Sequence, residues 1–122
     1  MHKALILCAY GGMVLFGTLH FLIDVVSHAW RGKHPPGADA ALYFGLHSAF
    51  SLGQLALGLL GLFLAARAIE LLGDPVVFAI SFAAVLGWLA ICIAFIPYWE
   101  PRVNVAIVGV MLVAAFLTRA AP

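Results

Sequence analysis

The sequence predicts an all-α integral membrane protein: a four-helix bundle that crosses the bilayer up, down, up and down. Of its 122 residues, 66% are hydrophobic and only 9% are charged, whereas a typical soluble domain has about 25% charged residues. The mean hydropathy is +1.15. The chain also lacks the period-2 alternation of membrane barrels. These observations together favour helices that face lipid.

The helices follow from four apolar stretches, because a membrane helix needs about 20 apolar residues. We expect spans at about residues 4–27, 40–66, 75–98 and 101–118, forming a single transmembrane domain over residues 1–122. An even number of spans places both termini on the same side of the membrane.

Residues that end helices separate these spans. The first break, residues 28–39, contains two prolines and two glycines, and Asp39 is expected to cap the second helix. The last break, residues 96–102, contains Pro97 and Pro101 and predicts a tight connection.

The middle break has a clearer stop and start signal. Gly73 is expected to end the preceding helical segment, Asp74 to cap the third helix, and Pro75 to occupy its first turn.

Basic residues do not decide the orientation. Three lie on the side of the termini (Lys3, Arg67 and Arg119) and three on the other side (Arg31, Lys33 and Arg102). The positive-inside rule is therefore balanced. Because the N-terminal amine adds a positive charge, we expect the termini in the cytoplasm, in a bacterial inner membrane.

Small residues recur in the apolar spans and predict close helix packing. They are Gly45, Ala49 and Gly53; Ala79, Ala83 and Gly87; and the pair Gly61 and Ala65. Such repeats hold one bundle together, and they also fit a homodimer.

Charged and imidazole groups interrupt the first span. Residues 16–28 read FGTLHFLIDVVSH, with His20, Asp24 and His28 at intervals of four, roughly one helical turn. His20 lies about eight residues from the end of the first span, and His47 lies about seven residues from the start of the second. The sequence therefore places both imidazoles at nearly the same depth.

Two histidines and a carboxylate form an open ligand set typical of iron, zinc or copper sites. We expect His20, Asp24 and His47 as metal ligands. His28 is the expected fourth ligand, and His34 or Glu100 could take its place. Haem is an alternative cofactor, with His20 and His47 as axial ligands. A hydrogen-bonded network that only fixes helix register is a further interpretation.

Other polar and aromatic groups are expected in the same half of the bundle as the histidines. The candidate cofactor contacts are Tyr43, Gln54, Trp88, Cys92 and Glu100.

These patterns favour a small membrane protein that binds a metal ion or haem, as a redox or metal-handling module in the lipid bilayer. One alternative is an accessory subunit of a larger membrane complex. Another is a homo-oligomeric transporter coupled to protons or cations through Asp24, and a third is a quinone or proton-relay pocket walled by Tyr43 and Trp99. The net charge of +1 gives no basic face for nucleic acid. No nucleophile–base pair has a recognisable spacing, so enzymatic activity is left open.

Overall fold

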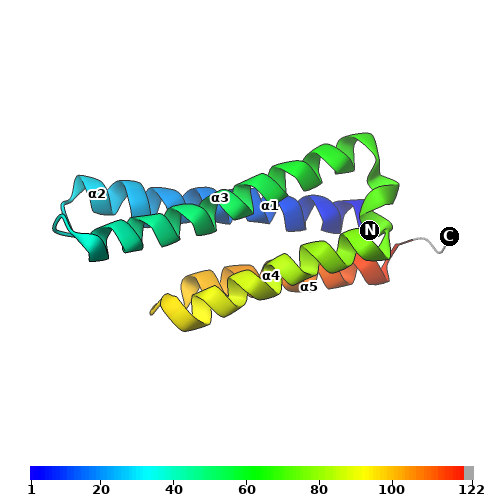
Figure 1. Ribbon diagram of the computed structural model, residues 1–122. Coiled ribbons are helices and arrows are strands. Elements are labelled where there is room, and N and C mark those ends of the chain that lie inside the picture. Colours follow the sequence, from blue (N-terminus) through cyan, green and yellow to red (C-terminus); the bar gives the residue numbers. More distant parts are fainter. Residues whose placement is uncertain (120–122) are drawn as a thin grey trace.

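The structure, a computed structural model, describes residues 1–119, and within them it contains only helices and connecting segments (Figure 1). Four helices are long and apolar enough to span a membrane: His2–Trp30, Ala38–Arg67, Pro75–Phe95 and Glu100–Leu117. The all-helical, membrane-type fold predicted from composition is therefore confirmed.

Three of the four helices are regular over their length: α3 (Ala38–Arg67), α4 (Pro75–Phe95) and α5 (Glu100–Leu117). The first helix, called helix 1 below, is continuous but composite. Its parts are α1 (His2–His20), a π-helical segment η1 (Phe21–Ser27) and the short α2 (His28–Trp30). A 3-10 turn, η2 (Ile69–Gly73), connects α3 to α4 and ends at the predicted glycine.

The helix ends differ from the expected spans by one to three residues, except at the start of α4, and helix 1 continues to Trp30 instead of residue 27. Two of these ends have a clear local cause. Helix α4 ends at Phe95 instead of residue 98, because Ile96 adopts an extended backbone (φ −108°, ψ 113°), as residues before a proline usually do. Helix α3 begins one residue before Asp39, with Gly37 as N-cap and no side-chain cap bond. The expectation that Asp39 caps this helix is therefore wrong.

The predicted start of α4 is confirmed. The Asp74 carboxylate accepts hydrogen bonds from the backbone N–H groups of Val76, at 2.7 Å, and Val77, at 3.3 Å. Pro75 lies in the first turn, where its missing N–H needs no partner.

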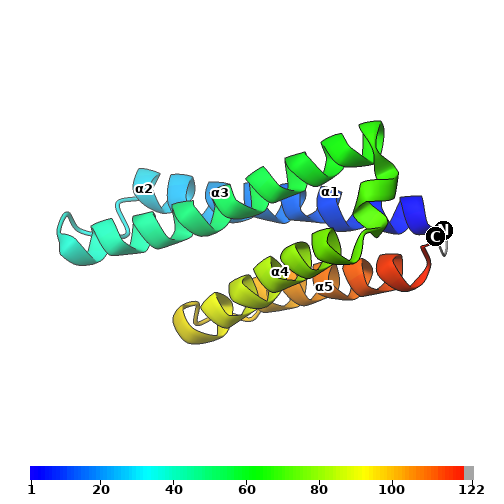
Figure 2. The same ribbon diagram turned by 45° about the vertical axis from the view of Figure 1, so that its right-hand side comes forward.

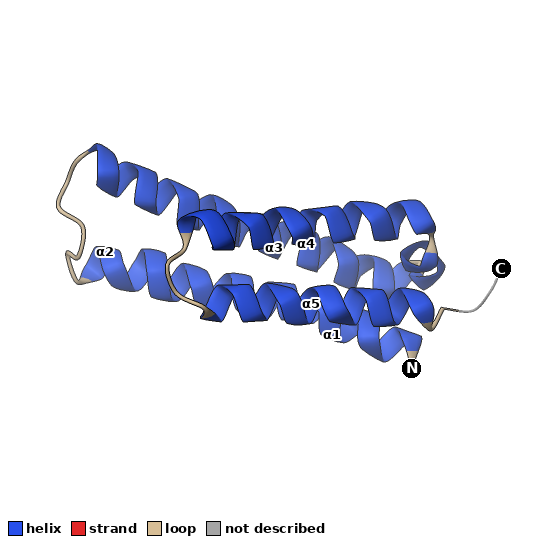
Figure 3. Cartoon of the chain, turned by 90° about the horizontal axis from the view of Figure 1, so that it is seen from below, coloured by secondary structure: helices blue, strands red, loops and turns tan. Residues whose placement is uncertain are grey.

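The helices pack as two neighbouring hairpins, with helix 1 against α3 and α4 against α5 (Figures 1 and 2). Helix 1 also packs along α5 and joins the hairpins. At one end, called the terminal end, His2 Nδ1 lies 2.7 Å from the carbonyl oxygen of Ala115. The connections 31–37 and 96–99 lie at the opposite end, called the loop end (Figure 3).

Candidate metal centre

The site residues of helix 1, His20, Asp24 and His28, lie in or next to its π-helical segment. Three of the seven residues in η1 are β-branched, which lowers the propensity for a regular α-helix. Short π-helical segments are rare and often occur at functional sites. The intervals of four in the sequence had suggested a regular α-helix, and they carry no signal for this irregularity.

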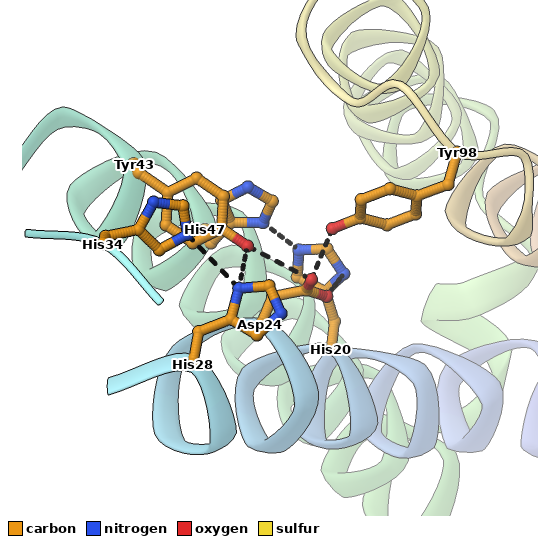
Figure 4. A network of polar contacts seen from close by, with 7 residues as sticks. All are labelled: His20, Asp24, His28, His34, Tyr43, His47 and Tyr98. Carbon is orange, nitrogen blue, oxygen red and sulfur yellow. Dashed lines mark hydrogen bonds and ion pairs between the residues drawn. The ribbon is translucent and has the colours of Figure 1, made fainter. Parts of the chain in front are cut away.

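His20, Asp24 and His47 form a compact buried cluster at this segment (Figure 4). His20 Nδ1 lies 3.1 Å from Asp24 Oδ2, and His20 Nε2 lies 2.8 Å from His47 Nδ1. The three residues are 7%, 5% and 3% exposed. The matched depth expected for the two imidazoles brings them into direct contact, across the interface between helix 1 and α3.

The donor atoms of this cluster are close enough to hold one ion. One ligand atom from each residue lies within 4.8 Å of the other two. Ligand atoms at about 2.0–2.2 Å from a tetrahedral zinc ion lie about 3.3–3.6 Å apart. Small side-chain adjustments would therefore bring all three onto one ion, and three protein ligands would leave coordination positions open.

Two tyrosines extend the network around Asp24 (Figure 4). Tyr98 donates a hydrogen bond to Asp24 Oδ1 at 2.5 Å, and Tyr43 donates to the same oxygen at 3.4 Å. The Tyr43 hydroxyl also lies 2.8 Å from His28 Nδ1, which in turn lies 3.4 Å from His34 Nε2. A chain of polar contacts thus leads from the 31–37 connection to the buried carboxylate.

Tyr98 is the main site residue that the sequence analysis missed. It lies in the 96–99 connection, for which the sequence predicted only a tight turn. Burial, and then the hydrogen bond to Asp24, raise the pKa of its phenol above the ordinary value. Tyr98 therefore remains a protonated donor. Its sequence position carries no signal for a contact with Asp24, which is 74 residues away.

The other expected metal ligand, His28, lies apart from the three-residue cluster. Its ring stacks on Tyr43, with 5.6 Å between ring centroids, and it faces His34. It belongs to the polar chain that leads to Asp24.

The five expected cofactor contacts separate into three groups. Tyr43 joins the network at Asp24, and Gln54 and Glu100 line a cavity beside it. Trp88 packs against Gly53 and lines a smaller neighbouring space. Cys92 is fully buried in the apolar core and does not belong to the cluster.

The cavity beside the cluster has a volume of about 520 Å³ and lies between helix 1 and the start of α5. His20 and Asp24 line one wall, and Tyr98 lines another. Tyr43 and Trp99 were both expected as walls of such a pocket, and neither lines it; Trp99 is 64% exposed.

Haem ligation by the two clustered histidines finds no support in this geometry. The rings of His20 and His47 are stacked, with 4.9 Å between their centroids, and they are directly hydrogen-bonded. A porphyrin held between these two rings would require them to separate.

Comparisons of the chain with family models, curated proteins and solved structures give no match. Its function is therefore argued from the site.

Proposed function

We propose that this integral membrane protein binds a transition-metal ion, iron, zinc or copper, through His20, Asp24 and His47. The observation that carries the proposal is a buried carboxylate and two buried imidazoles whose ligand atoms lie within 4.8 Å of one another. A charged aspartate at the centre of a bilayer costs about 2.5–3.5 kcal/mol on insertion scales. A bound cation would offset this cost.

The hydrogen bonds around Asp24 support the same function. Tyr98 and Tyr43 both donate to Oδ1, whereas Oδ2 faces His20. Outer hydrogen bonds of this kind orient a metal-binding carboxylate and tune its affinity. The tyrosines would therefore hold Asp24 in position for the ion.

We further propose that the chain crosses the membrane four times, with both termini in the cytoplasm of a bacterial cell. The contact between His2 and Ala115 supports a shared side for the two ends of the chain. The metal site then lies in the half of the membrane nearer the outer face, next to the two loop-end connections.

Metal analysis by mass spectrometry tests the proposed function. The protein carries a tag without histidine and is purified in detergent without chelators, loaded with iron, zinc or copper, and dialysed. We expect about one ion per chain in the wild type, and loss of the ion in His47→Ala and in Asp24→Asn.

His2→Ala is the matched control, because it removes a histidine at the terminal end and leaves the cluster intact. It should retain the ion. A wild-type protein that is folded but metal-free after loading with each metal would overturn the proposal.

A second candidate function uses Asp24 as the coupling carboxylate of a proton or cation transporter. The polar chain from His34 through His28 and Tyr43 to Asp24 favours it. Proton uptake into proteoliposomes should then be lost in Asp24→Asn and reduced in Tyr43→Phe, in proteins that are equally well folded. Equal uptake in empty liposomes would exclude this function.

A further inference from the structure

The cavity beside the metal cluster has the size and lining of a small-molecule site. Its volume of about 520 Å³ falls in the range of roughly 300–1,000 Å³ that is typical of such sites. Phe16, Phe50 and Val105 give it apolar and aromatic walls, and Asn104 and Glu100 add polar groups from α5. This combination fits a mostly apolar ligand that is oriented by a few hydrogen bonds.

Gln54 gives a second, independent sign of a ligand. It lines the cavity and is only 4% exposed. Its amide makes no side-chain hydrogen bond among residues 1–119, and it is not one of the fully enclosed atoms without a partner, which in this part of the chain is Ser51 Oγ alone, so the amide is open to the cavity. Buried polar groups are nearly always paired, because leaving them unpaired costs free energy. An unpaired amide that borders a cavity therefore indicates that a polar group of a ligand or a water meets it there.

The cavity is accessible from the bilayer. Leu19 and Ile23 belong to its lining and are 44% and 55% exposed on the outer side of helix 1. Because this surface faces lipid, the ligand would enter from the membrane and must be lipid-soluble.

Charge narrows the class of ligand. Glu100, which is outside the proposed metal set, lines the cavity, and among residues 1–119 no lysine or arginine does. Fatty acids and phospholipid headgroups carry negative charge and would be repelled by this lining. The ligand is therefore expected to be uncharged.

The polar groups lie at more than one depth. Glu100 and Asn104 are one turn apart on α5, about 6 Å by the helical rise, and Gln54 faces the cavity from α3. A sterol has one polar end and would use only one of these levels. A ring with oxygens on opposite sides can use both.

We propose that this cavity binds the ring of a lipid-soluble quinone or quinol, with Gln54 and Asn104 as hydrogen-bonding partners of its oxygens. The proposal goes beyond the metal site and does not depend on it, because neither amide belongs to the metal cluster. Binding is therefore tested on the full chain after chelator treatment.

The probe is duroquinone, added to the detergent-purified protein, and the readout is tryptophan fluorescence. Trp88 lines the small space that shares Phe16, Gln54 and Asn104 with the cavity, so a bound quinone would quench it. We expect saturable quenching that an excess of durene, the same methylated ring without oxygens, does not reverse.

Gln54→Leu and Asn104→Leu should each weaken duroquinone binding three- to tenfold, since each removes a hydrogen bond worth about 1 kcal/mol. Asn104 is only half-buried, so its replacement tests the proposal even where Gln54→Leu fails to fold. The control, Leu86→Ala, alters a separate apolar groove on α4 and α5 and should leave the affinity unchanged.

Three results would overturn the proposal: quenching that rises linearly without saturation, displacement by durene at equal concentration, or unchanged affinity in a folded leucine variant. Each of these would mean that the probe only partitions into apolar surface or detergent.

Discussion

The two ends of the bundle bury tyrosine hydroxyl groups in opposite ways. At the terminal end, the Tyr10 hydroxyl lies 2.8 Å from Ser81 Oγ, a pair that satisfies itself within close-packed helices. At the loop end, Tyr98 and Tyr43 both donate to Asp24, beside a cavity. The terminal end is thus tightly packed, whereas the loop end is less tightly packed and contains a polar site beside a cavity.

Glycines at the two ends of α3 show the same contrast. A Cβ atom at Gly58 would lie 2.8 Å from Val14 Cγ2, and one at Gly61 would overlap the Tyr10 ring. A Cβ atom at Gly45, near the loop end of the same helix, would have no neighbour within 4 Å. Close helix approach, which the small residues predicted along the whole of α3, is therefore found at Gly58 and Gly61 and not at Gly45.

The largest expected effect is that of Gly61→Ala. The added methyl group would collide with the buried, rigid Tyr10 ring, so the free energy of unfolding should fall by about 3 kcal/mol. Reversible unfolding in SDS, followed by circular dichroism, measures the change.

Gly45→Ala is the matched control at the loop end of α3. It should leave stability unchanged, or raise it by up to about 1 kcal/mol, because alanine is the better helix former. Equal losses in both variants would mean that the two ends do not differ in packing.

A smaller effect should distinguish the two tyrosine environments. Tyr98→Phe and Tyr10→Phe each remove one hydroxyl and should each lower the free energy of unfolding by about 1 kcal/mol. Only Tyr98→Phe should also weaken metal binding, by about tenfold, because its hydroxyl orients Asp24. Competition with a chelating dye measures the affinity, and a tenfold loss in Tyr10→Phe would contradict a site confined to the loop end.

Composition and span length were enough to predict the helices, because a membrane requires about 20 apolar residues whatever the tertiary contacts. Counting residues from the ends of the spans also predicted that His20 and His47 lie at the same depth, because both are a similar distance from the connection that joins their helices. The cluster is thus the part of the site that depends mainly on local geometry.

The rest of the site depends on tertiary structure that the sequence pattern does not encode. The contact of Tyr98 with Asp24 requires the 96–99 connection to lie against helix 1, although the two residues are 74 positions apart. Likewise, His28 contacts Tyr43 directly after a π-helical segment that the regular spacing could not reveal. The cavity at Gln54 arises only where the two hairpins meet.

The smallest expected difference concerns how the helices begin at the two ends. At the terminal end, Asp74→Ala removes the side-chain cap of α4 and should cost about 1 kcal/mol of unfolding free energy. At the loop end, Asp39→Ala removes no cap bond and loses only an attraction to the helix dipole, about 0.3 kcal/mol at an exposed position. Reversible unfolding in SDS measures both changes in unfolding free energy.

A cost in Asp39→Ala as large as that in Asp74→Ala would show that the loop end is held by local interactions as firmly as the terminal end. A small cost would instead support a start of α3 that relies on the Tyr43 and His47 contacts one and two turns further along the helix.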